Sequence, residues 1–164
     1  MQLSGPSLVA VATGIVGSAW SAGAIMSLSV IAAPAAKAVP QTTAQVWSEL
    51  YARGASIMPK VGAAVALSYA YAAGDIYGRG AADPSLWQGL AAAAACVLAI
   101  VPFTLTAMKT TNGQLHVAAT QSSAGKDEHV ERLVETWGRL NFARGLFPLM
   151  GTMLGIKVLV DGTQ

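Results

Sequence analysis

Long apolar stretches alternate with short polar segments along this chain. The apolar stretches cover about 7–33, 57–73, 86–108 and 137–160, and most charged and turn-forming residues lie between them. A helix that crosses a bilayer needs about 20 apolar residues. These stretches show neither the alternation of a half-buried strand nor the polar stripe of a soluble amphipathic helix. The pattern therefore predicts four transmembrane helices.

The first predicted span begins near residue 7 and ends at Pro34. Gly14, Gly17 and Ser21 form a stripe of small residues on it, and such stripes let helix backbones approach closely in a membrane. The span lacks a preceding Lys or Arg and is longer than the roughly 7–15 apolar residues of a signal-peptide core. We therefore expect it to be retained in the mature protein and its glycines to serve packing.

The first and third connections and the third span each contain a further indication of helical structure. Residues 44–52 predict a short interfacial helix in the first connection, where Trp47 and Tyr51 would anchor the chain at the membrane surface. Pro102 predicts a kink in the third span, because proline cannot donate a helical hydrogen bond. The mixed charges of 126–135 predict a solvated helix that continues into the fourth span.

Composition supports a membrane protein. Hydrophobic residues make up 54% of the 164 residues and charged residues only 11%, against about a quarter in soluble domains. The fold class expected is therefore all-α, an integral membrane four-helix bundle forming a single domain over 1–164. A net charge of +2, with no basic cluster between aromatics, excludes a nucleic-acid partner. The lone Cys96 lies in an apolar run and predicts neither a disulfide nor a zinc site.

The placement of cations predicts the orientation in the membrane. The first and third connections and the adjoining span ends hold most of them, namely Lys37, Arg53, Lys60, Lys109, Lys126, Arg132 and Arg139, while the opposite side holds Arg79 and Lys157. Under the positive-inside rule, 34–58 and 109–136 are cytosolic, and both termini and the 75–84 turn face the lumen or exterior.

Polar residues inside the fourth span are candidates for chemistry. Asn141 and Arg144 lie three residues apart and share a helix face, with Trp137 one turn earlier. A guanidinium in an apolar span is costly unless it faces a polar cavity or a partner. The pattern favours a functional cavity, and snorkelling of Arg144 to the cytosolic boundary is the structural alternative.

A second group lies at the same predicted membrane side, at the end of the third span. Phe103 and Thr104 precede Thr111 and Asn112, and His116 follows one turn later. Imidazole exchanges protons readily near neutral pH, so His116 is a candidate base, although a surface position is the more common role of such a histidine. The threonines and Asn112 could equally cap or end the helix.

The remaining titratable residues are weaker candidates for a functional site. His129 lies among charged residues and is expected to be solvated, and Asp75 is predicted on the opposite membrane side. The predicted spans hold no carboxylate and no histidine pair, which weighs against a di-iron or haem site. The sequence also lacks a phosphate loop, a nucleophile elbow and an HExxH motif.

Two stretches, VPFTLTAMKTTNGQLH and WGRLNFARGLFPLMGTMLG, resemble the anthrone oxygenase family, small four-span membrane proteins of polyketide pathways. The family pattern has Pro-Phe-Thr at the end of the third span, then Thr-Asn, then Trp, Asn and Arg at the head of the fourth. The matching positions are Pro102, Phe103, Thr104, Thr111, Asn112, Trp137, Asn141 and Arg144. Many relatives carry proline where this chain has Thr110, a small departure.

The resemblance implies oxidation of an anthrone to an anthraquinone by O₂, without flavin or an added metal, in the membrane of the endoplasmic reticulum or of vesicles. The expected partners are an aromatic polyketide substrate and the lipid bilayer. In this hypothesis Arg144, Asn141 and Asn112 stabilise an anthrolate oxygen, and His116 or a water takes the proton. The substrate would be bound by Trp137, Phe103, Thr104, Thr111, Trp47 and Tyr51.

Two other functions stay open at this stage: a non-enzymatic four-span scaffold and a small transporter. Neither explains why polar residues gather at one end of the third and fourth spans. The substrate's substitution pattern, a homo-oligomer and a bound lipid or metal are equally open, with His116 and His129 as the histidines available to a metal.

Overall fold

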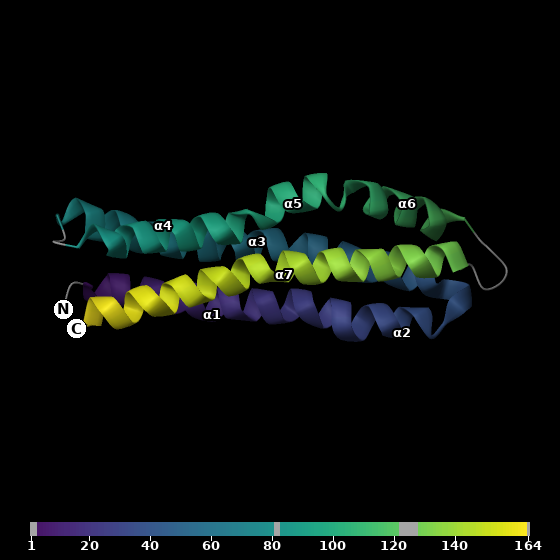
Figure 1. Cartoon of the computed structure of the whole chain (residues 1–164), viewed down its shortest axis with the longest axis horizontal. Helices are drawn as coiled ribbons and strands as arrows, with labels where there is room; N and C mark the ends of the chain where they lie inside the picture. Colours follow the sequence, from purple (N-terminus) through teal and green to yellow (C-terminus); the bar gives the residue numbers. More distant parts are fainter. Residues whose placement is uncertain (1–2, 81–82, 122–127, 164) are drawn as a thin grey trace. The chain divides into compact units, whose positions relative to one another are not determined.

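A computed structural model describes residues 3–80, 83–121 and 128–163, and all regular structure in them is helical (Figure 1). The all-α prediction is thus confirmed. The elements are α1 (Gly5–Ser27), the π-helical turn η1 (Leu28–Ala32), α2 (Ala33–Lys37), the 3₁₀ turn η2 (Pro40–Thr42), α3 (Thr43–Gly78), α4 (Pro84–Leu98), α5 (Ile100–Thr106), α6 (Lys109–Thr120) and α7 (Glu128–Thr163).

Three helical segments in the described part of the chain are long and apolar enough to cross a membrane. They are Gly5–Lys37, Pro84–Thr106 and Glu128–Gly162. They contain the first and fourth predicted spans and all of the third except residues 107 and 108. By their length and composition these segments indicate a helical membrane protein. The remaining predicted span, 57–73, lies within α3 and is not among the three, so its crossing stays a prediction.

The predicted short interfacial helix at 44–52 is wrong as a separate element. These residues form the beginning of α3, which continues for 36 residues and contains Pro59. A proline removes one helical hydrogen bond, and good helix-forming neighbours on both sides can carry the helix through that loss. Trp47 is also only 1% exposed, so it is a core residue and not an interfacial anchor.

Two other prolines affect the helix boundaries. The first predicted span does not end at Pro34, because this residue occupies the first turn of α2, where a backbone N–H is not needed, and the helix runs on to Lys37. The helix is interrupted next to Pro102, where the sequence predicts a kink: α4 ends at Leu98, four residues before the proline, and α5 begins at Ile100.

The polar region after α5 is more ordered than its composition indicated. Residues 109–120 form α6, which buries Thr111, Asn112 and Leu115. The predicted charged helix is confirmed for 128–135, the beginning of α7, while 126 and 127 lie outside the described residues.

The chain divides into two compact units. The first unit comprises Met1–Ala22, Pro59–Ile100 and Leu146–Gln164, and the second comprises Gly23–Met58 and Val101–Gly145. α1, α3 and α7 contribute residues to each unit. The prediction of a single domain over 1–164 stays a prediction.

The first unit is packed through glycines on α1, as the sequence pattern predicted. A Cβ on Gly14 would lie 2.5 Å from a ring carbon of Tyr69, and one on Gly17 would lie 2.5 Å from a methyl of Val65. The Tyr69 hydroxyl lies 3.0 Å from Ser18 Oγ, which lies 2.8 Å from Thr152 Oγ1. Close backbone approach and a satisfied polar network thus hold α1, α3 and α7 together here.

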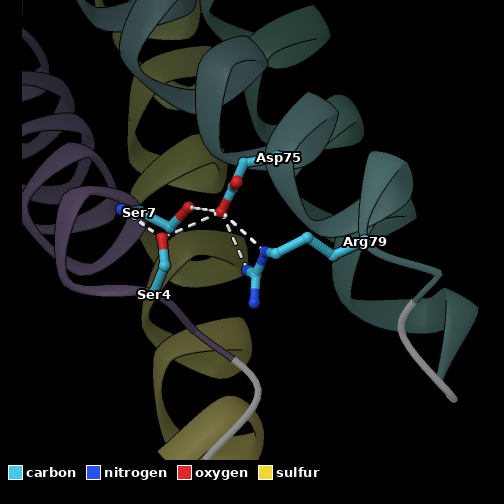
Figure 2. Close-up of polar contacts among 4 residues, drawn as sticks. All are labelled: Ser4, Ser7, Asp75 and Arg79. Atoms are coloured by element: carbon cyan, nitrogen blue, oxygen red, sulfur yellow. Dashed lines mark hydrogen bonds and ion pairs between the residues drawn. The ribbon is translucent and has the colours of Figure 1, made fainter.

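Asp75 lies at the end of α3 in the first unit and accepts hydrogen bonds from four donors (Figure 2). The Ser7 hydroxyl donates to Oδ2, the Ser4 hydroxyl does so at 2.9 Å, and Arg79 donates from Nη2 at 2.8 Å. The hydrogen bonds from Ser7 and Ser4, with that from Arg79, lower the pKa of the Asp75 carboxyl. Because every contact stabilises the carboxylate, Asp75 is poorly suited to act as a base.

Asp75→Asn should weaken the folded protein at neutral pH and reduce its sensitivity to acid. The pKa of Asp75 is lower in the folded state than its ordinary 3.8, so its stabilisation is present above the unfolded pKa and is lost as the pH falls through the folded pKa. Melting temperatures of the detergent-purified protein between about pH 7 and pH 3 measure this. Glu49→Gln, at an exposed carboxylate on α3, is the control; equal pH profiles for Asp75→Asn and the unmodified protein would contradict the assignment.

Candidate functional site

Arg144 is held inside the second unit by two hydrogen bonds. Its Nη1 donates to Thr104 Oγ1 of α5 at 3.1 Å, and its Nη2 donates to Asn141 Oδ1 at 2.5 Å. Both bonds are charge-assisted, which makes them stronger than bonds between neutral groups. The guanidinium is therefore held by α5 and by its own helix α7, and the choice between a cavity-facing and a snorkelling Arg144 stays open.

Asn141 is fully buried and connects α7 to the first helical segment. Its Nδ2 donates to the Ile25 carbonyl of α1 at 2.7 Å and to Ser29 Oγ of η1 at 2.9 Å. One amide thus orients Arg144 through its oxygen and joins two other elements through its nitrogen. Ser29 lies in the π-helical turn, and such turns within α-helices occur frequently at functional sites.

An aromatic cluster from α3, α6 and α7 forms a second part of the site. Trp47 stacks on Tyr51 with ring centroids 5.2 Å apart, and it meets His116 and Trp137 edge-on at 5.0 and 6.0 Å. His116 also contacts Tyr51 edge-on at 5.0 Å. The side chains of Trp47 and Trp137 are each only 1% exposed.

Four buried polar atoms among the described residues have no hydrogen-bond partner: Trp47 Nε1, Trp137 Nε1, Asn112 Oδ1 and Arg144 Nε. All four lie in the second unit. A buried polar group without a partner costs about 1–3 kcal/mol, so four of them in one unit call for a specific explanation such as a bound ligand. Three donors and one acceptor would suit a flat molecule that carries both an oxyanion or carbonyl and a hydroxyl.

The structure unites most of the predicted site residues. Hydrogen bonds connect Arg144, Asn141 and Thr104, and ring contacts connect Trp47, Tyr51, Trp137 and His116. Tyr51 is also close enough to Arg144 for an electrostatic interaction, which links the two groups. Phe103 packs, partly buried, against the same core, and Thr111 and Asn112 are buried on α6.

Other sequence-predicted candidates do not join this group. Asp75 belongs to the first unit and is engaged with Ser4, Ser7 and Arg79. His129 is exposed on the first turn of α7. Across 3–80, 83–121 and 128–163, no three His, Cys, Asp or Glu side chains gather in a way that could hold a metal ion.

An open groove of about 240 Å³ also lies in the second unit. Its lining residues come from η1, α2 and α7: Ser29, Val30, Ala33, Pro34, Lys37, Glu135, Gly138, Arg139 and Phe142. No predicted site residue lines it. Ser29 nevertheless connects the groove to the buried network, because its hydroxyl accepts from Asn141.

Sequence reasoning missed Ile25 and Ser29. The Ile25 contribution is a backbone carbonyl, which no side-chain pattern reveals. The one indication in the sequence was that Ser29 is a polar residue in an apolar span. This indication is weak, because a serine hydroxyl can donate a hydrogen bond to a carbonyl of its own helix. Its partner Asn141 is 112 residues away in sequence, so only tertiary structure identifies the pair.

Comparison with known proteins matches a sequence model described as anthrone oxygenase to residues 47–154, which include every predicted site residue. A monooxygenase of Dothistroma septosporum is 36% identical over 140 residues, covering 82% of this chain and 74% of the relative. Anthrone oxygenases of Aspergillus novofumigatus and Paecilomyces divaricatus are 35% and 32% identical, covering 91% and 88% of this chain and 92% and 91% of those proteins. No solved structure matches.

Asn141→Leu should lower the free energy of unfolding by about 2–4 kcal/mol, because it removes the amide that bonds the Ile25 carbonyl and Arg144 Nη2. Thermal or denaturant unfolding in detergent, followed by circular dichroism, measures the loss. Thr136→Ala on the same helix removes only a bond to its own helix carbonyl and should change stability little. Equal effects of the two substitutions would show that the Asn141 network contributes no special stability.

Proposed function

The chain belongs to the anthrone oxygenase family, and on that premise we propose that it oxidises an anthrone of aromatic polyketide origin to an anthraquinone with O₂. The protein is an oxygenase by its relationship to these enzymes. The scaffold and transporter alternatives are not retained, because the named oxygenases match most of the chain.

One observation supports placing the reaction in the second unit. The buried atoms without partners, including Arg144 Nε and the two indole N–H groups, lie in the same unit as a fixed guanidinium and a cluster of aromatic rings. A flat phenolic ketone offers oxygen atoms for these donors and ring faces for stacking. Asn112 Oδ1 would accept from a hydroxyl of the same ligand.

The proposed reaction balances without a further reductant. Removing one proton from the anthrone CH₂ gives an anthrolate, in which the negative charge is shared with the ketone oxygen. The electron-rich carbon then reduces O₂ and forms a C–O bond, which gives a hydroperoxide after proton uptake. Loss of the second C–H proton with cleavage of the O–O bond releases water and leaves the quinone carbonyl. Anthrone and O₂ thus become anthraquinone and water, and an organic cofactor is not required.

The residues take roles that follow from their chemistry. Arg144 and the indole N–H groups of Trp47 and Trp137 would stabilise the anthrolate oxygen, a form of preorganised electrostatic stabilisation. Asn141 and Thr104 position Arg144 by direct hydrogen bonds. His116, or a water in its place, would accept the proton. The remaining ring contacts would come from Phe103 and Tyr51, with Thr111 lining the same end of the site.

The distribution of Lys and Arg supports an orientation with the second unit's polar end at the cytosolic side and both termini in the lumen or exterior. We propose the membrane of the endoplasmic reticulum or of vesicles as its location, the location that a fungal polyketide pathway would suggest.

Arg144→Ala should lower kcat/KM for emodin anthrone by at least about 100-fold, because it removes the principal charge that stabilises the anthrolate. Anaerobic substrate is mixed with aerated buffer and detergent-purified protein, and quinone absorbance is recorded above the spontaneous rate. Arg132→Ala on the same helix removes an exposed cation paired with Glu128 and is the matched control. An unchanged rate in folded Arg144→Ala protein would show that Arg144 takes no part in the reaction.

His116→Ala should reduce the rate, because it removes the group proposed to accept the proton of the substrate. The exposed His129 serves as the control through His129→Ala. A full rate in His116→Ala protein would assign the proton to water.

A chelator should have no effect on the rate in the same assay. Loss of activity on chelation would overturn the cofactor-free mechanism and would indicate both histidines as metal ligands.

A further inference from the structure

We propose that the groove formed by η1, α2 and α7 in the second unit binds the headgroup of an anionic membrane phospholipid. This site is separate from the proposed catalytic group, and the inference does not depend on the reaction. It rests on the groove's shape, its charges and the apolar helices that carry it.

The floor and walls of the groove are mostly apolar and open. Val30 is 63% exposed and Phe142 is 43% exposed, and each lies on a helical segment apolar enough to cross a membrane. Gly138 adds no side chain to this lining. Exposed apolar walls of this kind suit acyl chains that run along the helices in the bilayer.

The charges at the groove are unbalanced in favour of an anion. Lys37 from α2 and Arg139 from α7 share the single carboxylate of Glu135. Arg139 Nη2 lies 2.6 Å from Glu135 Oε1, whereas Lys37 Nζ lies 3.8 Å from Oε2, beyond hydrogen-bond distance. The Lys37 ammonium therefore keeps N–H donors for an added phosphate. Lys37, Arg139 and Glu135 together carry a net charge of +1.

The position of the cations favours a lipid over a free anion. Basic pockets between membrane helices bind anionic headgroups, and cations near the ends of spans lie where the headgroups are. Lys37 ends the first apolar segment, and Arg139 lies five residues before Arg144 on α7. A phosphate that contacts both cations would place its acyl chains against Val30 and Phe142.

The test measures retention of dioleoylphosphatidylglycerol against dioleoylphosphatidylcholine by native mass spectrometry of the detergent-purified protein. The anionic lipid should bind in preference, and Lys37→Gln and Arg139→Gln should each weaken its binding by about fivefold, the effect of one cation near an anionic surface. Glu135→Gln should strengthen binding, because it removes the carboxylate that competes for both cations. Arg139→Lys keeps the charge and should retain binding.

Arg53→Gln and Arg132→Gln are matched controls. Each cation pairs with a carboxylate one turn away, Glu49 and Glu128 respectively, and neither lines the groove. Both variants should bind the anionic lipid as the unmodified protein does. Equal losses in the controls, equal retention of the two lipids, or no gain in Glu135→Gln would each overturn the proposal. So would displacement of the lipid by millimolar inorganic phosphate or by emodin anthrone, which would assign the groove to a free anion or to the substrate.

Discussion

Burial of a guanidinium in an apolar helix is the constraint on which the second unit depends. Such a group is costly in a membrane unless partners replace its water, and Arg144 finds them in Thr104 and Asn141. Asn141 in turn uses its amide nitrogen on Ile25 and Ser29. One charge on α7 therefore sets the positions of α5, α1 and η1 through a chain of hydrogen bonds that would be expensive to break.

The two units differ in whether their buried polar atoms have hydrogen-bond partners. In the first unit Tyr69, Ser18 and Thr152 satisfy one another, and the glycines of α1 let the helices close around them. In the second unit the described residues leave two indole N–H groups, one amide oxygen and one guanidinium N–H unpaired. The first arrangement favours stability alone. The second retains hydrogen-bonding capacity at a cost, which is the arrangement expected where a ligand is to be bound and its developing charge stabilised.

The aromatic cluster and the arginine network serve complementary needs. Trp47, Trp137 and Tyr51 provide flat apolar surfaces with polar edges, and Arg144 provides a fixed positive charge near Tyr51. The open groove belongs to the same unit but is lined by other charged side chains, Lys37, Arg139 and Glu135. The second unit thus carries the Arg144 network and, apart from it, a groove with two cations and one carboxylate.

Helix content, the three apolar segments and the candidate residues Arg144, Asn141 and Trp137 followed from the sequence by itself. The reason is that helical periodicity and the length needed to cross a bilayer are local properties, which can be recognised within about 20 consecutive residues. The sequence predicted a short helix at 44–52 separate from the span at 57–73, whereas α3 runs without a break through both. Tertiary structure alone decided that Asn141 binds Ser29, that His116 packs against Trp47, and that Lys37 meets Glu135. These partners lie roughly 70 to 110 residues apart, and their pairing depends on how whole helices pack, which no local pattern encodes.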